Sequence, residues 1–299
     1  MGNNLKEIRT QIQSVKSTQK ITKAMKLVST SKLKRADEMA RRSRLYADKI
    51  VAVFQEIHDR LQEQGGGVDI PFFAQREGEP KRVDIVFITA DKGLCGGFNS
   101  TTIKEIMRLI GVYKAKNTKV CLHAIGKKGI SFFDFNGMSL ASRIEELSSV
   151  PDYQKSSKFI NEVVADFLEG TTDRVILVHN GFKNMISQQL KTQQLLPIES
   201  SSVLRDAATT VHAPIEIEPS GGETEILNQL AVKYVEFSMY FALVDSLVAE
   251  HSARMQAMDS ATNNAGELVR NRTIAYNKAR QGAITTELVE INTGVESMK

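Results

Sequence analysis

The residues best placed for chemistry form a glycine-rich turn after a short apolar run. Arg82–Ala90 (RVDIVFITA) has the character of a buried strand, and Lys92–Asn99 (KGLCGGFN) follows it directly. A glycine-rich turn between a strand and a helix N-terminus can cradle an anion. The spacing, however, is neither GxGxxG nor GxxxxGK followed by Ser or Thr. A structural role in tight backbone turns is therefore favoured for three glycines, Gly93, Gly96 and Gly97.

The remaining candidate side chains are scattered. The five histidines form no HExxH motif, no GxSxG motif is present, and the two cysteines fit neither a metal-ligand spacing nor a disulfide framework. His251 falls on an apolar helical stripe, where packing explains it better than metal binding, and Cys95 has no base beside it in the sequence. The sequence thus predicts no catalytic residue, no metal site and no cofactor.

Two long helices must flank this central region. Residues 3–64 contain no glycine or proline, and Gly65–Gly67 with Pro71 should end the first helix. From Glu223 to Lys299 there is no proline, and apolar residues recur every 3.5 positions from Leu227, which is typical of a helix that supercoils on a partner. We predict an antiparallel coiled coil of segments 1–64 and 221–299, closed by a domain inserted at 65–220.

The inserted region alternates strands and helices. Strands are predicted at Arg82–Ala90, Lys119–Ile125 and Arg174–His179, with helices at Ser100–Lys116 and Tyr153–Leu168. This alternation indicates a mixed α/β fold with an open, mostly parallel, Rossmann-like sheet. Two further strands are less strongly indicated, at Gln188–Leu196 and Ala213–Ile217.

The lengths of the two helices predict an exposed tip. If Leu61 lies near Leu227, then Leu5 lies near Ala283, and the chain beyond projects past its partner. This projecting segment, Ile284–Lys299, is rich in apolar side chains, and a single helix of that kind is neither stable nor soluble alone. Another protein should therefore surround it. The alternative is that the segment is a frayed C-terminal tail. A second irregularity lies at Gln19–Ser31, where the heptad positions of the first helix are polar instead of apolar. This polar waist could contact outside chains.

Charge and composition limit the alternatives. The net charge is +4, but residues 1–64 carry 14 basic and 7 acidic side chains. A basic first helix could meet nucleic acid, anionic lipid or an acidic protein, or could simply be solvated. No apolar run approaches the roughly 18–20 residues of a membrane span, and the N-terminus lacks the apolar core of a signal peptide, so a cytosolic protein is expected.

Three stretches resemble the gamma subunit of the rotary proton-translocating ATP synthase, in its bacterial form. They are Ser14–Lys34 (SVKSTQKITKAMKLVSTSKLK), the glycine turn Lys92–Asn99, and a C-terminal series. The C-terminal series comprises Ala253–Ala265 (ARMQAMDSATNNA), Tyr276–Gln281 (YNKARQ) and Ile284–Ser297 (ITTELVEINTGVES). Their order, spacing and placement at both ends make the match specific over the whole chain. Within the last stretch, the valine after glycine stands where that family usually has alanine.

The resemblance implies a non-catalytic central-stalk rotor subunit. Its terminal helices would form a shaft inside a ring of three alpha and three beta subunits, and its base would sit on the membrane c-subunit ring and contact the epsilon subunit. Rotation driven by the proton gradient would force the catalytic beta sites through different affinities, which is conformational coupling. The resemblance implies no cofactor and no nucleic-acid partner. It places the chain on the cytoplasmic face of the bacterial inner membrane, as a peripheral protein attached only through the complex.

The resemblance also assigns residues. Met25 and Lys26, in the polar waist, match a contact with an acidic beta-subunit segment. Further positions match contacts with beta-subunit loops: Arg254, Arg280, Gln281, Thr285 and Glu287. Four residues match a tip that turns in an apolar sleeve: Ile284, Leu288, Ile291 and Val295. Two other functions stay open: a nucleotide- or phosphate-binding enzyme that uses the glycine turn, and a coiled-coil adaptor whose basic helix binds nucleic acid or lipid.

Overall fold

The computed structural model describes residues 2–63, 71–73, 78–198 and 223–298. The chain divides into two compact units. One comprises residues 1–30 and 254–299, and the other comprises residues 31–253. The sequence-based division into 1–64, 65–220 and 221–299 cuts the chain elsewhere, because it follows the ends of the helices, and it stays a prediction.

Both predicted terminal helices are present. Helix α1 spans Gly2–Glu63 and helix α6 spans Glu223–Glu296, while a single 3-10 turn, η1, occupies Pro71–Phe73. In the unit of residues 31–253, the ring centroids of Tyr46 and Phe237 lie 4.8 Å apart, and the Tyr240 hydroxyl lies 3.8 Å from Met39 Sδ. The later residue of α6, Tyr240, therefore contacts the earlier residue of α1, Met39. The two helices consequently run antiparallel, as predicted.

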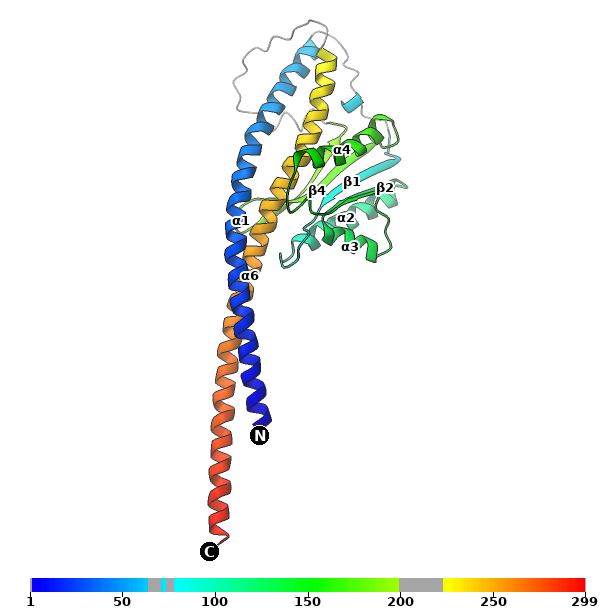
Figure 1. Ribbon diagram of the computed structural model, residues 1–299. Helices are drawn as coiled ribbons and strands as arrows, with labels where there is room; N and C mark the ends of the chain where they lie inside the picture. Colours follow the sequence, from blue (N-terminus) through cyan, green and yellow to red (C-terminus); the bar gives the residue numbers. More distant parts are fainter. Residues whose placement is uncertain (1, 64–70, 74–77, 199–222, 299) are drawn as a thin grey trace. The chain divides into compact units, whose positions relative to one another are not determined.

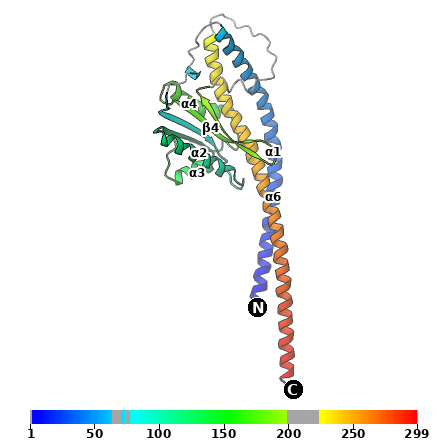
Figure 2. The same ribbon diagram turned by 180° about the vertical axis from the view of Figure 1, so that it is seen from behind.

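The central sheet has five strands in the order β3-β2-β1-β4-β5. Strands β1 (Arg82–Ile88), β2 (Lys119–Ile125), β3 (Ser142–Ile144) and β4 (Arg174–Phe182) pair in parallel, and β5 (Gln188–Leu196) is antiparallel to β4. Helices α2 (Phe98–Ala115), α3 (Lys127–Phe135) and α4 (Tyr153–Leu168) connect the strands. Figures 1 and 2 show α4 on one face of the sheet and α2 with α3 on the other. The mixed α/β fold with a mostly parallel sheet is confirmed.

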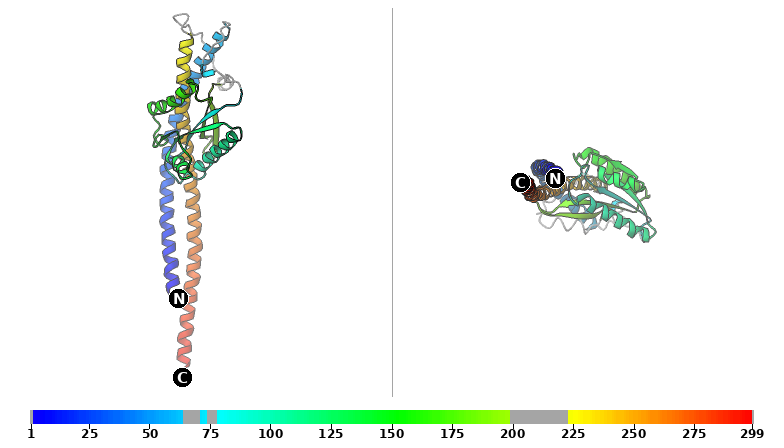
Figure 3. Two further views of the ribbon diagram at one scale, coloured as in Figure 1. Left: turned by 90° about the vertical axis from the view of Figure 1, so that its right-hand side faces the viewer. Right: turned by 90° about the horizontal axis from the view of Figure 1, so that it is seen from below.

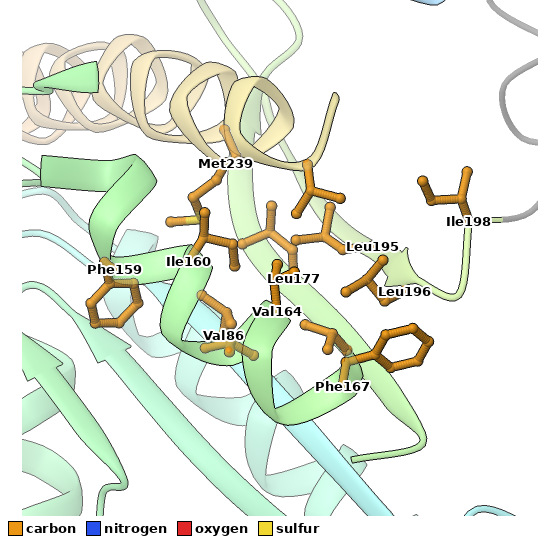
Figure 4. Packing of buried hydrophobic residues seen from close by; sticks show 14 of the residues in the cluster. Val86, Phe159, Ile160, Val164, Phe167, Leu177, Leu195, Leu196, Ile198 and Met239 are labelled. Carbon is orange, nitrogen blue, oxygen red and sulfur yellow. The ribbon is translucent and has the colours of Figure 1, made fainter. Parts of the chain in front are cut away.

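Each face of the sheet has its own apolar core. On one face, Val86 and Leu177 of the sheet pack with Ile160 of α4 and Met239 of α6 (Figure 4). On the other face, Ile85 and Ile176 pack with Ile106 of α2 and Phe133 of α3. Strand residues therefore alternate between two cores, which is why the parallel strands read as continuous apolar runs.

The part of α6 in this unit is buried on more sides than the heptad pattern predicts. The predicted stripe includes Phe237 and Val244, which are buried. A second apolar stripe faces the sheet and α4, and its buried members are Ala231, Val235, Met239, Ala242 and Leu243. Every residue from Ala242 to Ala253 is buried. This segment of α6 is consequently a core element of the α/β unit as well as a coiled-coil strand.

Some elements were not predicted from the sequence. Helix α3 and the three-residue strand β3 are missing from the sequence prediction, because each is too short to show a periodic pattern. The strand predicted at Ala213–Ile217 lies outside the described residues. The side chain of Leu61, predicted to lie near Leu227, also lies outside them.

Candidate functional site

The described C-terminal end of α6 presents a row of exposed apolar side chains. Within the unit of residues 1–30 and 254–299, the α6 end continues past the start of α1 (Figure 3, left). The exposed fractions of Ile284, Leu288, Ile291 and Val295 are 49%, 59%, 58% and 54%. Val289 and Met298 are also exposed. Such a row is an interaction surface by its physical chemistry, because a monomeric soluble protein rarely leaves one uncovered.

Polar residues predicted to contact partners lie on the same stretch of α6. Arg280, Gln281, Thr285 and Glu287 are all exposed. Arg254 differs, since only 8% of it is exposed and it already interacts within the chain. The structure therefore brings four of these residues together with the apolar tip on one exposed helix and places Arg254 in a buried stretch.

The polar waist is a cross-helix hydrogen-bonded layer in the same unit. Lys26 Nζ lies 2.6 Å from Asp259 Oδ1, with both side chains partly exposed. Thr262 Oγ1 donates to Thr22 Oγ1 over 2.7 Å, and the Gln19 amide donates to the Thr262 carbonyl over 3.4 Å. Lys26 thus has an acidic partner inside the chain, which the sequence reading did not foresee.

This pairing fixes the register of the two helices in the unit. Continued along antiparallel helices, the pairs Lys26–Asp259 and Thr22–Thr262 put Leu5 opposite Ala279 and Arg280. Because α1 begins at Gly2, the same register carries the pairing on to Gly282 and Ala283, so the part of α6 that projects past α1 begins close to the predicted Ala283. The waist also turns apolar side chains outward: Ile21, Leu27 and Val28 are all more than half exposed, while Met25 is partly buried.

The glycine turn after β1 is closed by its own hydrogen bonds. The Asn99 side chain accepts from the Ala90 amide over 2.8 Å, and the Gly97 carbonyl accepts from the amide of Thr101 over 2.9 Å. Cys95 is buried against Phe98 and Ala249 of α6. Gly96 has a φ of 57°, which favours glycine, whereas a side chain at Gly93 or Gly97 would meet only ordinary contacts. These features support the predicted structural role at Gly96, while the same role for Gly93 and Gly97 stays a prediction.

The neighbouring helix N-terminus is also filled from within the chain. Asp91 accepts hydrogen bonds from the Lys127 amide at the start of α3, from the Glu146 amide, and from the hydroxyls of Ser148 and Ser149. Burial acts to raise the pKa of Asp91, but these four bonds outweigh it and hold the pKa below its usual value. A carboxylate therefore occupies the N-terminus of α3, where an external anion could otherwise bind, whereas the glycine turn itself leads into α2.

Close backbone contact leaves no space at this point either. Gly126 has a φ of 95°, and a Cβ there would collide with the Thr89 carbonyl. Thr89 Oγ1 accepts from the Gly129 amide over 2.9 Å, which satisfies a second donor of the α3 N-terminus. The N-terminus of α3 is consequently closed by groups of the chain itself.

Two buried ionisable clusters lie in the α/β unit. Asp84, fully buried, accepts from Arg82 over 3.0 Å and contacts His123 Nε2 at 3.3 Å. Burial acts to raise the pKa of Asp84, yet the bonds from His123 and Arg82 hold it below its usual value. His123 Nδ1 also lies 2.7 Å from Ser142 Oγ, so the cluster ties strands β1, β2 and β3 together.

The second cluster joins α6 to the β4–β5 hairpin. Asp245 Oδ2 lies 2.7 Å from Lys191 Nζ and 3.3 Å from His179 Nε2, and Asp245 Oδ1 accepts from the Phe182 amide. Burial lowers the pKa of His179 despite its bond to Asp245. Burial raises the pKa of Asp245, but His179 and Lys191 outweigh it and lower the pKa overall. Sequence patterns could not reveal either cluster, because their members lie on separate elements.

Two further kinds of feature, a metal-binding cluster and a membrane-spanning helix, are absent from the residues that the structure describes. Among residues 2–63, 71–73, 78–198 and 223–298, no group of three or more His, Cys, Asp or Glu side chains could hold a metal ion. In the same ranges, no helix has both the length and the apolar character needed to cross a bilayer. The strongest candidate site is thus the exposed part of α6 and the waist.

The fold and these surfaces define a class of protein with long antiparallel terminal helices, a mostly parallel α/β sheet and an exposed apolar surface suited to contacts with other chains. A family model described as ATP synthase matches residues 4–298. The chain is 65% identical over 301 residues to the ATP synthase gamma chain of Wolinella succinogenes, covering 100% of both chains. It is 56% identical to the gamma chain of Helicobacter pylori strain Shi470, covering 99% of both. The chain therefore belongs to the ATP synthase gamma chain family.

Solved structures agree with this assignment. The central stalk and c-ring structure of Tetrahymena thermophila mitochondrial ATP synthase contains a chain that is 30% identical, with a TM-score of 0.59, covering 81% of this chain and 99% of that one. A chain of the Euglena gracilis mitochondrial ATP synthase OSCP/F1/c-ring structure has a TM-score of 0.68 over 100% of this chain and 95% of that one. At 19% identity, the Euglena match shows the fold alone.

Proposed function

We propose that this chain is the non-catalytic central-stalk rotor subunit of an ATP synthase. It transmits rotation, driven by the membrane proton gradient, to a catalytic ring of alpha and beta subunits, so that ATP is synthesised, or hydrolysed in reverse. The observation that carries the proposal is the 65% identity to a gamma chain over the full length of both proteins. Its partners are the alpha, beta and epsilon subunits and the c-subunit ring, and a c-ring is part of both the Tetrahymena and the Euglena structures.

The exposed surface of α6 supports this role. The apolar row Ile284, Leu288, Ile291 and Val295 forms the bearing that turns in an apolar sleeve of the ring. Arg280, Gln281, Thr285 and Glu287 form polar contacts with the beta subunits. Polar contacts suit a rotating part, because they can form and break in water at low net cost, whereas a continuous apolar seam would hold one orientation.

The waist contributes a second contact with the beta subunits. Met25 lies beside the ion pair of Lys26 and Asp259, and exposed Ile21 and Val28 flank it. Because Asp259 already balances Lys26, the contact with an acidic beta segment depends on the combined surface rather than on a free lysine. Arg254 stays a predicted contact with a beta-subunit loop, although only 8% of it is exposed.

The chemistry of ATP lies on other subunits in this proposal. Asp91 fills the N-terminus of α3, and Gly93, Gly96 and Gly97 are assigned as structural residues, a role that the φ of 57° supports at Gly96. No cofactor, metal or nucleic acid is required. The protein is peripheral on the cytoplasmic face of the bacterial inner membrane and is held there only through the complex.

The first experiment is affinity capture of the tagged full chain from native membranes. Co-purification of alpha, beta and c subunits is expected, and their absence would contradict the rotor assignment. Calorimetric titration of the isolated chain with ATP and ADP tests the rival enzyme, for which micromolar binding is the expected result. Titration with DNA and anionic vesicles at several salt concentrations tests the adaptor, which requires steeply salt-dependent binding.

A matched pair of substitutions tests the waist contact. Met25→Lys adds a positive charge that attracts an acidic beta segment, so we expect fewer protons pumped per ATP hydrolysed, with normal assembly. Met107→Lys places the same charge on exposed α2 and should leave coupling unchanged. Equal coupling in both variants would show that the waist is not a beta-subunit contact.

A further inference from the structure

A cavity in the α/β unit has no role in the proposed rotor function. It is a solvent-open hollow of about 560 Å³ between α2, the segment before β1 and the start of β4. Cavities of this size hold small organic molecules. Its lining residues are Gly78, Glu79, Pro80, Arg108, Leu109, Val112, Tyr113, Lys116 and Arg174.

The charges of the cavity wall leave one cation unmatched. Arg108 is paired with Glu105 at 2.7 Å, and Lys116 is paired with Glu79 at 2.9 Å. Arg174 has no ion pair among the described residues, and its Nε atom is buried without a hydrogen-bond partner there. A buried unpartnered donor is costly, and a guanidinium binds carboxylate or phosphate oxygens in a forked geometry.

The position of Arg174 is unusual for its strand. Alternate residues of β4, Ile176 and Val178, belong to the apolar core under α2. Since side chains two apart on a strand share a face, Arg174 continues this row at the end of the core. A charged group thus stands where an apolar one would extend the packing, and it lines the cavity.

The rest of the wall suits an apolar body. Leu109 and Tyr113 are buried, while Val112 is 42% exposed at the cavity. The C-terminus of α2 presents little free negative charge, because the Tyr113 carbonyl accepts from the amides of Lys116 and Thr118. With one unmatched cation, the wall fits a single oxyanion group better than a polyphosphate.

We propose that this cavity binds a small organic molecule that carries one carboxylate or phosphate group on an apolar body. Arg174 holds the oxyanion, and Leu109, Val112 and Tyr113 contact the apolar part. The site shares no residue with the glycine turn or with the exposed end of α6, so it is additional to the proposed rotor function.

The test is a titration of the full chain followed by amide NMR signals of Val112 and Tyr113. Four probes are compared at millimolar concentration: phenylacetate, phenyl phosphate, inorganic phosphate and ADP. We expect saturable shifts with phenylacetate or phenyl phosphate, and the one that binds more tightly identifies the oxyanion. Inorganic phosphate and ADP should bind at least about tenfold more weakly. Absence of saturation with both aromatic probes, or equal binding of inorganic phosphate, would overturn the proposal.

Variants locate the binding site. Arg174→Gln should weaken binding of the preferred probe by about tenfold or more. Lys114→Gln removes a charge from α2 outside the cavity and should leave the affinity unchanged. Val112→Glu places a carboxylate at the exposed rim of the cavity, where it repels an anionic probe, and should abolish binding. This variant tests the site even if Arg174→Gln does not fold. Unchanged affinity in Arg174→Gln, or in Val112→Glu, would place the ligand elsewhere.

Discussion

One helix, α6, is stabilised in two different ways along its length. From Leu227 to Ala253 it packs within the α/β unit, and every residue from Ala242 onward in this stretch is buried. From Arg254 to Glu296 it belongs to the other unit, and beyond Ala265 no described residue is fully buried. The first stretch is stabilised by its own chain, whereas the second exposes apolar side chains that need a partner. Position along a helix thus decides whether an apolar residue serves folding or assembly.

The largest difference in the free energy of unfolding should come from replacing a leucine by alanine in each of the two stretches of α6. Leu243→Ala removes a fully buried side chain from the core and should lower the free energy of unfolding by about 2–5 kcal/mol. Leu288→Ala removes a side chain that is 59% exposed and should change it by at most about 0.5 kcal/mol. Urea unfolding followed by circular dichroism measures both. Similar losses for the two variants would remove the distinction between the two stretches.

Removing an ion pair should also cost more stability in the first stretch of α6 than in the second. Asp245→Ala leaves the buried His179 and the Phe182 amide without their acceptor and should cost about 2–3 kcal/mol. Asp259→Ala breaks a half-exposed pair with Lys26 and should cost no more than about 1 kcal/mol. The same unfolding assay ranks them. A larger loss for Asp259→Ala would mean that the waist, not the hairpin contact, anchors α6.

The buried histidine predicts a pH dependence for the α/β unit. Because the pKa of His179 is lower in the folded than in the unfolded chain, its contribution to stability is fully present above the unfolded pKa, near 6.5. It is lost as pH falls from there toward the folded pKa, at a limiting slope of about 1.4 kcal/mol per pH unit. The wild-type chain should therefore lose more stability than His179→Gln between pH 7 and pH 5.5. Parallel losses would show that His179 is not the titrating group.

The smallest effects should come from helix glycines in the exposed stretch. A Cβ added at Gly282 would meet no atom within 4 Å, so Gly282→Ala should stabilise the local helix by about 0.5–1 kcal/mol. At Gly266 a Cβ would lie 2.9 Å from the flexible Gln19 amide nitrogen, so the gain should be smaller. Amide hydrogen exchange in α6 reports both changes. A destabilised Gly282→Ala would indicate that this stretch already contacts another part of the chain.

Much of the fold is predictable because periodic patterns are long here. The two terminal helices, three parallel strands and the strand Gln188–Leu196 follow from 3.5-residue and apolar-run patterns in the sequence. The exposed tip follows from comparing helix lengths. The second apolar face of α6, with Val235 and Met239, was missed because one heptad stripe was enough to explain the pattern.

The side-chain partners could not be predicted in the same way. Asp259 lies 233 positions from Lys26, and Asp245 lies 66 positions from His179. No local pattern marks such pairs, because they depend on how separate elements pack. The burial of Arg254 was missed for the same reason, since a charged residue in a helix reads as solvated.

Direct observation of rotation tests the central claim. The complex containing this chain is immobilised through its alpha and beta subunits, and a probe is attached through Lys114→Cys on exposed α2, with Cys121→Ser to remove the partly exposed native thiol and Cys95 left buried. On addition of ATP, the account predicts continuous rotation of the probe in one direction, with replacement of Leu288 and Ile291 by serine reducing the torque. A probe that stays fixed relative to the ring while ATP is hydrolysed would contradict the account.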